Sequence, residues 1–344
     1  MNFPMKALVW EGPEVMTMRD WPEPVAAEGE VVIRVAHVGI CGSELGGYLG
    51  HNALRVPPLV MGHEFSGIVT AVAEGAATEL VPGDTVTCNP MVPCGTCAFC
   101  AEGLPHLCAT RSLIGAHRPG AFAELVAVPA RAAYRLPAGM SLQLGAMIEP
   151  FAVGIRIGRQ AGDVAGRPVL VIGAGPIGLL ALQMLAAGGA TEVFVADLDP
   201  ERRAMAAELG GTAIDPADTP TVARVRAATG GLGVPLTVDA VGSAGTRAEA
   251  VAATRSGGTV LLSGLHAEAS DFPASEVIRR EITVKGVFCY DARDFADAIE
   301  AAAQGTLTLG RWVVEAPLEE GGAWFDRLVQ RPGNVSKVLL RPVA

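Results

Sequence analysis

The segment VLVIGAGPIG, residues 169–178, constrains the fold of this chain more than any other part of its sequence. A run of Val, Leu and Ile leads directly into Gly173, Gly175 and Gly178, spaced G-x-G-x-x-G, and an uncharged Ala- and Leu-rich stretch follows. The first glycine permits a tight turn, the second lets backbone approach a pyrophosphate, and the third lets helix and strand pack closely. The segment therefore predicts a strand, a turn and a helix whose N-terminus binds a dinucleotide. The alternative is a glycine-rich turn without a ligand.

An acidic residue follows at the distance that dinucleotide binding requires. Asp197 ends the strand pattern EVFVAD, nineteen residues after Gly178, where a carboxylate accepts hydrogen bonds from the adenosine ribose. Because a carboxylate there repels a 2′-phosphate, we expect NAD rather than NADP, with Arg202 and Arg203 close by as the counter-argument. Arg202 is expected to cover the adenine or, alternatively, to be a solvated helix residue. The expected cofactor-binding residues are Gly173, Gly175, Pro176, Ile177, Gly178, Asp197 and Arg202.

The pattern around this motif predicts an α/β protein with two packed cores and a cleft between them. From about Gly154 to Tyr290, apolar strands alternate with Ala-rich helices, which is typical of a doubly wound parallel sheet. An amphipathic helix and a short closing segment follow. The first 150 residues instead contain short β segments broken by Gly and Pro, for example residues 30–40, 65–73 and 84–88.

Composition excludes several classes of protein. Half of the 344 residues are apolar and 18% are charged, which excludes a disordered chain. The formal net charge of -10 repels nucleic acid and anionic lipid surfaces, so we expect neither as a partner. Residues 168–191 carry no charge, but their five glycines and Pro176 indicate a buried strand, turn and helix rather than a membrane span. The N-terminus lacks the pattern of a signal peptide, so we expect a cytoplasmic protein.

Four of the seven cysteines form a compact motif. Cys94, Cys97, Cys100 and Cys108 are spaced C-x2-C-x2-C-x7-C. Without an export signal, metal binding is favoured over disulfides. Four thiolates on one loop close a tetrahedron around Zn²⁺ and leave no open position, so the motif predicts a structural zinc site. Free cysteines or an iron–sulfur cluster are the alternatives.

A second, dispersed set has the chemistry of a catalytic zinc site. Cys41 lies in GICGSE, His63 and Glu64 lie in GHEFSG, and Glu149 lies in MIEPF. Together they offer sulfur, nitrogen and oxygen ligands, the mixture that leaves one position for water or substrate. His63 alone would be read as a buried core histidine. Spacing alone does not assign this set.

These motifs make the family recognisable. The chain resembles the zinc-dependent medium-chain dehydrogenases, and in particular the polyol branch that includes the sorbitol, threonine, butanediol and galactitol-1-phosphate dehydrogenases. The resemblance implies a GroES-like β-rich catalytic domain over residues 1–153, a Rossmann domain over 154–290 and a return to the catalytic domain over 291–344. It also implies two zinc ions per chain and a homodimer or homotetramer. The motifs are GICGSE, GHEFSG, PGDTV (82–86), the four-cysteine loop, GAFAELVAVP (120–129), EPFAVG (149–154) and GAGPIGLLA (173–181).

The resemblance also implies roles for site residues. Cys41 and His63 are expected to bind the catalytic zinc, with Glu64 or Glu149 completing the set. Ser43 is expected to accept the alcohol proton while a secondary alcohol is oxidised to a ketone and its hydride passes to NAD. The substrate is expected to be a polyol, a sugar acid, a phosphorylated polyol, a β-hydroxy amino acid such as L-threonine, or a vicinal diol.

Four positions depart from the family pattern and bear on the substrate. Gly46 stands where many relatives have a histidine that ends a proton relay, so the relay must end in water or another residue. Glu44 replaces the usual Asp, Arg156 replaces a His, and Cys289 stands where the polyol branch often has Arg. We therefore expect an anionic or strongly hydroxylated substrate contacted by Arg156. Tyr48, Phe122 and Phe288 are candidate pocket walls or core residues.

Two other classes fit parts of this sequence. A zinc-independent quinone or enone reductase lacks a ligand at Cys41 and lacks the four-cysteine loop, and this chain has both. A non-catalytic dinucleotide-binding relative would not need the ligand set together with Ser43.

Overall fold

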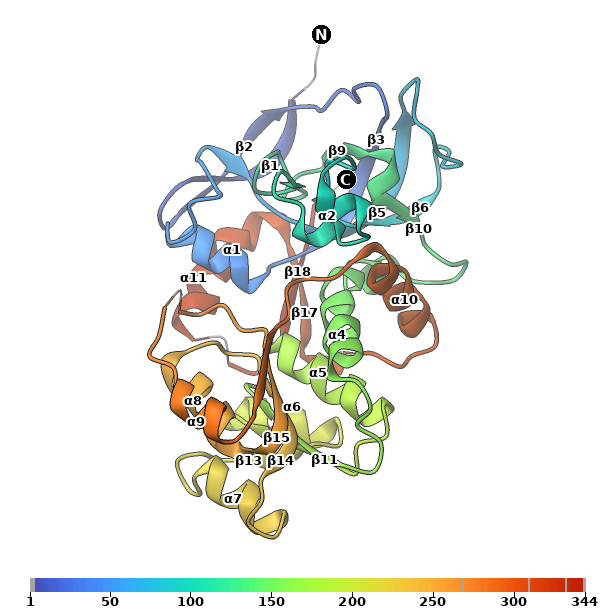
Figure 1. Cartoon of the computed structure of the whole chain (residues 1–344). Coiled ribbons are helices and arrows are strands. Elements are labelled where there is room, and N and C mark those ends of the chain that lie inside the picture. The colour runs from blue at the N-terminus through green and yellow to red at the C-terminus, as the bar shows by residue number, and fades with distance from the viewer. Residues whose placement is uncertain (1–3, 268, 309, 332, 343–344) are drawn as a thin grey trace. The chain divides into compact units, whose positions relative to one another are not determined.

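The chain divides into two compact units (Figure 1). The expected three-part division by function stays a prediction. The computed structural model describes residues 4–267, 269–308, 310–331 and 333–342. Unit 1 comprises the described residues of Met1–Pro150, Asp291–Gln304 and Gly310–Ala344, and unit 2 comprises those of Phe151–Tyr290 and Gly305–Leu309.

Unit 1 is built on a seven-stranded sheet that joins distant parts of the chain. Its strand order is β10-β6-β5-β3-β18-β17, with β9 also paired to β3. The pairs are antiparallel except for β17 with β18. In Figure 1 the late strands β17 and β18 are red and β3 is blue; β18 pairs directly with β3, and β17 lies outside β18. The strands expected at residues 30–40, 65–73 and 84–88 are confirmed. The bounds are β3 (Glu30–Gly39), β5 (Glu64–Val72), β6 (Thr85–Cys88), β9 (Leu125–Pro129), β10 (Ala133–Arg135), β17 (Val313–Pro317) and β18 (Lys337–Arg341).

Among the described residues, two smaller sheets and five α-helices complete unit 1. β1, β2 and β4 form one sheet, and β7 pairs with β8. Phe122 and Phe325 meet edge to face with ring centroids 5.8 Å apart in the main core, and Tyr48 packs on Phe325. Tyr48 and Phe122 are therefore core residues. The bounds are β1 (Pro4–Gly12), β2 (Val15–Pro22), β4 (Leu59–Val60), β7 (Met91–Val92), β8 (Ser112–Leu113), α1 (Gly42–Tyr48), α2 (Ala98–Ala101), α3 (Leu142–Gly145), α10 (Ala292–Ala303) and α11 (Gly321–Gln330), with 3-10 turns η1 (Pro105–Leu107), η2 (Ala130–Ala132), η3 (Gly310–Trp312) and η4 (Leu318–Glu320).

Unit 2 is a doubly wound parallel sheet. Its strand order, β13-β12-β11-β14-β15-β16, reverses between β11 and β14, and all neighbouring pairs are parallel. Ligands of such sheets bind at the carboxyl ends of the strands where the order reverses. The bounds are β11 (Pro168–Ile172), β12 (Glu192–Ala196), β13 (Thr212–Ile214), β14 (Val234–Asp239), β15 (Thr254–Leu262), β16 (Thr283–Gly286), α5 (Pro176–Ala187), α6 (Pro200–Glu208), α7 (Thr221–Ala228), α8 (Ala244–Ala253) and α9 (Ala274–Arg279), and α4 (Ile148–Ala161) runs from unit 1 into unit 2.

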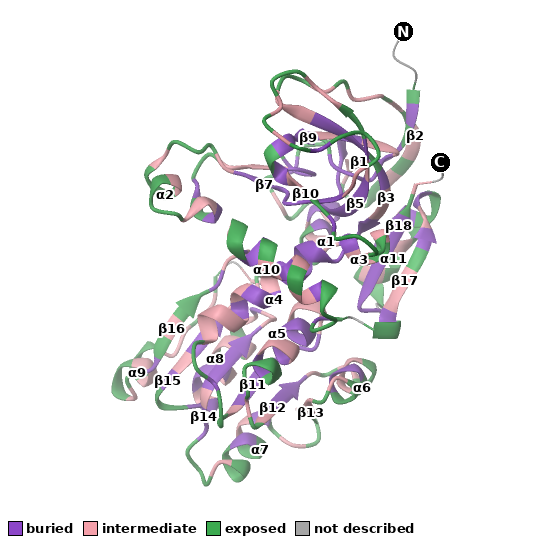
Figure 2. Ribbon diagram, turned by 90° about the vertical axis from the view of Figure 1, so that its right-hand side faces the viewer, coloured by how far each residue is buried: buried purple, intermediate pink, exposed green. Residues whose placement is uncertain are grey.

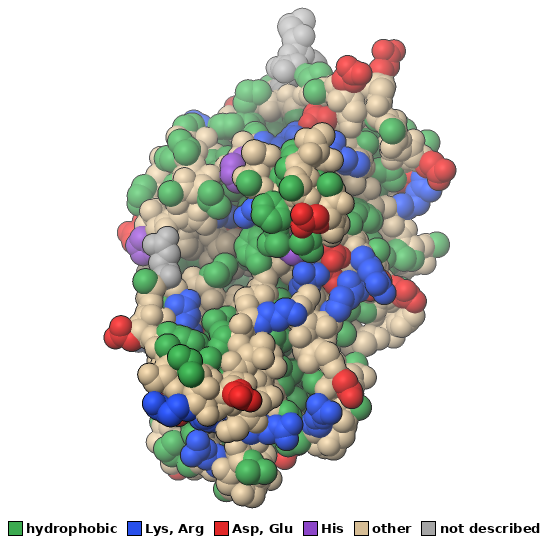
Figure 3. Space-filling view, viewed as in Figure 1, with side chains coloured by type: hydrophobic (Ala, Val, Ile, Leu, Met, Phe, Trp, Pro, Cys, Tyr) green, Lys and Arg blue, Asp and Glu red, His purple; other side chains and the backbone are tan. Residues whose placement is uncertain are grey.

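The uncharged stretch at residues 168–191 forms β11, a turn and α5, as its glycines and Pro176 predict. Among the described residues, no helix has the length and apolar character of a membrane span. In unit 2, α8 ends at Ala253 and β15 begins directly at Thr254. Figure 2 shows the central strands of the sheet as buried, and Figure 3 shows basic and acidic side chains interspersed over the viewed face.

Candidate metal and dinucleotide sites

Three of the expected catalytic-zinc ligands lie together at one end of the main sheet of unit 1. In the antiparallel pair of β3 and β5, Gly39 is opposite Glu64, so residues just after β3 face residues at the start of β5. The ligand atoms of Cys41, His63 and Glu64 accordingly all lie within 4.8 Å of one another. Glu149, in the first turn of α4, is not a member of this group. The structure thus brings Cys41 together with the adjacent residues His63 and Glu64, which lie more than twenty residues later in the chain.

The buried carboxylate of Glu44 links two of these candidate ligands. Its Oε2 accepts a hydrogen bond from the backbone N–H of Cys41 at 3.0 Å. Its Oε1 accepts from the backbone N–H of Gly62 at 2.8 Å and lies 2.9 Å from Nδ1 of His63. Because Nδ1 faces the carboxylate, Nε2 of His63 is the nitrogen left to bind a metal. The side chain of Glu44, which is longer than that of the usual Asp, therefore contacts both the segment with Cys41 and the segment with His63.

Charges around this carboxylate shift two pKa values. Burial would raise the pKa of Glu44, but His63, and then Arg55, outweigh it and lower that pKa. Burial would likewise lower the pKa of His63, but the negative charges of Glu44 and Cys41 raise it well above its usual value. A metal ion at this site therefore competes with a proton for His63.

Gly62 is required by the approach of two backbone segments. Its φ is +99°, and a Cβ there would lie 2.6 Å from the backbone nitrogen of Phe122. A side chain would be strained and would also collide with this backbone. The glycine of GHEFSG thus allows the following residue, His63, to turn toward Glu44.

Lys337 on β18 is a site residue that the sequence analysis did not identify. Its Nζ lies 2.7 and 2.6 Å from the two carboxylate oxygens of Glu64 and 3.1 Å from the carbonyl oxygen of Ile40. Both charged side chains are buried. Removing one partner from such a pair costs roughly 3–5 kcal/mol, because the other charge stays buried. The available signal was a lysine directly before the apolar run Val338–Leu340.

The donor set of this group fits zinc. A thiolate, an imidazole and a carboxylate are the ligands of catalytic zinc sites, which use three protein ligands and keep a fourth position open. Ser43 is exposed beside this group, and its hydroxyl donates to Sγ of Cys41 at 3.5 Å. Ser43 is therefore placed to contact a molecule that binds at the open position.

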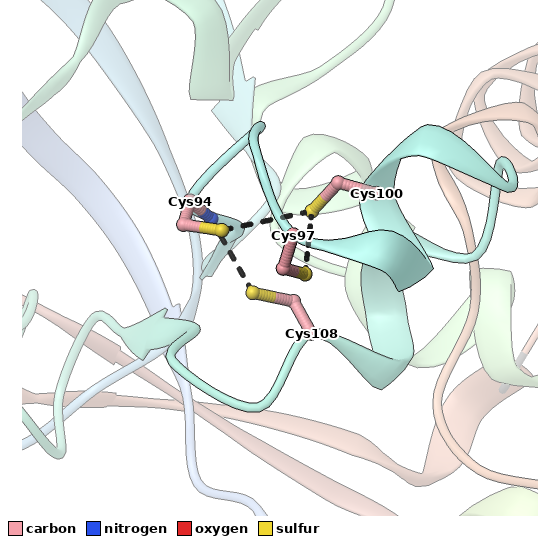
Figure 4. A group of neighbouring side chains, drawn as sticks. All are labelled: Cys94, Cys97, Cys100 and Cys108. Carbon is pink, nitrogen blue, oxygen red and sulfur yellow. Dashed lines mark hydrogen bonds between the residues drawn. The ribbon is translucent and has the colours of Figure 1, made fainter.

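The four thiols of the cysteine loop lie together, and among the described residues this group includes no His, Asp or Glu (Figure 4). The Sγ atoms of Cys97 and Cys100 are 3.6 Å apart, and those of Cys94 and Cys100 are 4.0 Å apart. Ligand sulfurs of a tetrahedral zinc site are separated by about 3.8 Å. The backbone N–H of Thr96 and neighbouring hydroxyls lower the pKa of Cys94 to about 5, which favours its thiolate. This geometry fits a closed zinc site.

The glycine motif of unit 2 lies where α5 begins. Gly178 packs so tightly that a Cβ would overlap the carbonyl oxygen of Gly173, whereas a Cβ on Gly175 would meet nothing within 4 Å. Gly175, Pro176 and Ile177 are partly exposed at this helix N-terminus. The third glycine thus brings helix and strand together, and the second leaves space for a phosphate beside free N–H groups.

Asp197 and the two arginines lie at the carboxyl end of β12. One carboxylate oxygen of Asp197 accepts from the backbone N–H of Ala174 at 2.7 Å, and the other accepts from that of Asp199 at 2.8 Å. Arg203 is held by Asp215 and by the carbonyl oxygens of Asp197 and Leu198. Arg202 is partly buried in the first turn of α6. Asp197 is therefore fixed beside the glycine turn.

Comparison with known proteins identifies the family. Residues 27–138 match the alcohol dehydrogenase GroES-like domain, and residues 176–304 match the zinc-binding dehydrogenase domain. The chain is 34% identical over 315 residues to 2-dehydro-3-deoxy-L-galactonate 5-dehydrogenase of Pseudoalteromonas atlantica, which covers 90% of this chain and 91% of that protein. The chain belongs to the zinc-dependent medium-chain dehydrogenase family. It is therefore an oxidoreductase that uses zinc and a nicotinamide dinucleotide to interconvert a secondary alcohol and a ketone.

Other relatives extend this comparison. (R,R)-butanediol dehydrogenase of Bacillus subtilis is 32% identical over 358 residues, covering 98% of this chain and all of that protein. An Escherichia coli CFT073 alcohol dehydrogenase solved with NADH has a TM-score of 0.91 and 30% identity, covering 98% of this chain and 99% of the other. A Sinorhizobium meliloti 1021 zinc-binding dehydrogenase solved with NADP has a TM-score of 0.90 and 30% identity, covering 99% and 100%.

The role of Glu44 predicts the behaviour of a conservative variant. Glu44→Gln removes the charge and points an amide N–H₂ at backbone N–H groups that need an acceptor, so we expect zinc affinity at the Cys41–His63 site to fall about 10- to 100-fold. Competition with a chromophoric chelator measures this affinity. Glu124→Gln is the matched control, because Glu124 also accepts a backbone N–H, that of Lys6, but belongs to no ligand group. Wild-type affinity in Glu44→Gln would contradict the role given to this carboxylate.

Proposed function

We propose that this chain oxidises a secondary alcohol within a polyhydroxylated acid or polyol, with NAD as the hydride acceptor. The observation that carries the proposal is the convergence of Cys41, His63 and Glu64 beside the exposed Ser43. The overall reaction converts R₂CHOH and NAD⁺ into R₂C=O, NADH and H⁺. The sugar-acid specificity in the name of the Pseudoalteromonas relative supports the substrate class.

The chain's own residues orient the alcohol and receive its proton. Zinc supplies a Lewis acid that lowers the pKa of an alcohol oxygen, and the nicotinamide supplies the hydride chemistry. Ser43 Oγ accepts the alcohol proton through a hydrogen bond and passes a proton on. Glu44 keeps His63 in one tautomer and holds the backbone at Cys41. The oxidation therefore releases one proton for each hydride transferred.

We further propose that Glu64, rather than Glu149, is the third zinc ligand. Glu64 belongs to the group whose ligand atoms lie within 4.8 Å, and Glu149 does not. Lys337 is charged in this environment, because the carboxylate of Glu64 outweighs burial and raises the pKa of Lys337. The lysine thus holds the Glu64 carboxylate in place beside Cys41 and His63.

Variants of the two glutamates separate these assignments. We expect Glu64→Gln to weaken catalytic-zinc binding at least about tenfold, because a charged ligand is lost, and Glu149→Gln to leave it within about twofold. Since Glu64→Gln also leaves Lys337 buried and unpaired, the double variant Glu64→Gln/Lys337→Met removes both charges. Zinc titration should show weak binding in the double variant too. Loss of zinc in Glu149→Gln with full retention in Glu64→Gln would reverse the assignment.

The preference for NAD rests on two contacts in unit 2. The carboxylate of Asp197 is held beside the glycine turn by the N–H of Ala174, where it repels a 2′-phosphate. Arg203, which could balance a phosphate, already binds Asp215. The ribose would therefore meet the Asp197 carboxylate, while the Arg203 guanidinium is already paired with Asp215.

An amide at position 197 tests this preference. We expect Asp197→Asn to lower the ratio of kcat/KM for NAD over NADP at least about tenfold, because a charge repulsion worth about 1.4 kcal/mol is a factor of ten. Initial rates with both cofactors measure the ratio. Asp199→Asn is the control, because Asp199 caps α6 instead. An unchanged ratio in Asp197→Asn, or a wild-type preference for NADP, would count against the assignment.

A substrate panel tests the proposed reaction. NAD reduction is followed with polyols, aldonates, sugar phosphates, β-hydroxy amino acids and vicinal diols, and zinc is measured on the same sample. We expect two zinc ions per chain and turnover with hydroxylated acids or polyols, and a 10²- to 10⁴-fold lower kcat in Ser43→Ala, the range for removal of a proton-transfer group.

Arg156 adds a second readout to the panel. It lies on α4 in unit 2, and we propose that it binds an anionic substrate group. Arg156→Ala should then raise KM for the best acidic substrate at least tenfold and leave KM for neutral polyols unchanged. Equal KM values for the acidic substrate in the two proteins would remove Arg156 from the proposal, and no turnover anywhere in the panel would overturn the substrate class.

A further inference from the structure

A buried arginine donates two hydrogen bonds to Ser43. Arg55, in the loop between α1 and β4, is 4% exposed. Its Nη1 donates to the carbonyl oxygen of Ser43 at 3.3 Å, and its Nη2 donates to Oγ of Ser43 at 3.4 Å. Among the described residues, no carboxylate lies within ion-pair distance of Arg55, and its buried Nε has no hydrogen-bond partner. Burying a guanidinium without an ion pair is unfavourable. The charge of the nearby Glu44 carboxylate offsets part of this cost, and the contacts with Ser43 require an explanation of their own.

The contacts of the Ser43 hydroxyl supply that explanation. A hydroxyl has one proton to donate and two lone pairs that accept. In Ser43, the proton is directed to Sγ of Cys41 and one lone pair accepts from Arg55. One lone pair then remains on this oxygen, and Ser43 itself is exposed. An alcohol that approaches this oxygen meets a single acceptor with a fixed direction.

We propose that Arg55 is a positioning residue for alcohol oxidation, which holds the main chain and the hydroxyl of Ser43 so that Oγ presents one lone pair to the substrate alcohol. This inference rests on the proposed function. Arg55 does not take over the relay that a histidine provides in many relatives, because a guanidinium is never deprotonated in proteins and has no lone pair to offer. The proton that passes through Ser43 therefore goes to water or to a residue other than Arg55, once the Ser43 O–H has turned away from Sγ of Cys41.

Two neighbouring glycines show how the fold admits this arginine. A Cβ on Gly47 would lie 2.6 Å from Cδ and 3.2 Å from Nε of Arg55, whereas a Cβ on Gly46 would meet nothing within 4 Å. Gly47 thus provides the space that the Arg55 side chain occupies. Gly46, at the position of the missing histidine, faces open space. The two glycines are adjacent on the same helix, so they form a matched pair for substitution.

Three substitutions of Arg55 separate its charge from its hydrogen bonds. Arg55→Met removes both, Arg55→Gln keeps a neutral donor, and Arg55→Lys keeps the charge and a donor. We expect kcat to fall about 10- to 100-fold in Arg55→Met, less than the roughly 10²- to 10⁴-fold loss for complete removal of a proton-transfer group, with KM changed less than threefold. Arg55→Lys should recover most of this loss and Arg55→Gln part of it. Zinc content should stay at the wild-type value in all three.

A double-mutant cycle tests whether Arg55 acts through Ser43. In the Ser43→Ala background, Arg55→Met should lower kcat by less than a further twofold, because the group that Arg55 positions is already absent. Gly47→Ala should lower kcat as Arg55→Met does, by displacing the guanidinium, and Gly46→Ala should leave kcat unchanged. The proposal would be overturned if the losses of kcat in the two single variants multiplied in the double variant. It would also be overturned if Arg55→Met changed only KM.

A structural readout keeps this inference distinct from the proposed function. Crystal structures of the wild type and of Arg55→Met should show Ser43 Oγ beside Cys41 in one rotamer in the wild type and displaced or in several rotamers in the variant. If the wild type turns over no member of the panel, the proposed function fails while these structures still decide the role of Arg55. An unchanged Ser43 rotamer in Arg55→Met, or loss of zinc from that variant, would overturn the positioning role.

Discussion

The arrangement of the candidate metal site in unit 1 depends on one buried carboxylate with three hydrogen-bond partners. The carboxylate of Glu44 accepts hydrogen bonds from the backbone N–H groups of Cys41 and Gly62 and faces Nδ1 of His63. A buried carboxylate is costly unless its oxygens are satisfied, so the same contacts that stabilise Glu44 also fix the two segments that carry candidate ligands. The positions of Cys41 and His63 are therefore coupled through a group that does not itself belong to the metal-binding set.

Much of unit 2 and the four-cysteine loop could be predicted from the sequence because their signals are local. The strand before Gly173, the glycine spacing and Asp197 lie within 30 residues, and the structure places them at one end of one sheet. Cys94 to Cys108 lie within one loop, and their thiols converge without help from distant strands. Periodicity and spacing report such short-range structure directly.

The catalytic set is different because its geometry is created by strand pairing. Nothing in the spacing of Cys41 and His63 indicates that the end of β3 meets the start of β5. That set was assigned by resemblance, and its roles stay predictions. Lys337 and Arg55 had no usable signal beyond a charged residue next to apolar ones. Their importance appears only when the fold places a lysine from β18 on Glu64 and an arginine from a loop beneath Ser43.

The ion pair between Lys337 on β18 and Glu64 has a consequence for biosynthesis. Lys337 is translated 273 residues after Glu64, so during synthesis the glutamate exists for most of the chain's elongation without its lysine. At usual rates of roughly 5–20 residues per second, this interval lasts tens of seconds. The four-cysteine loop, in contrast, has all of its thiols within fifteen residues, Cys94 to Cys108. On the ribosome, the four-cysteine loop therefore has all of its thiols long before Glu64 can meet Lys337.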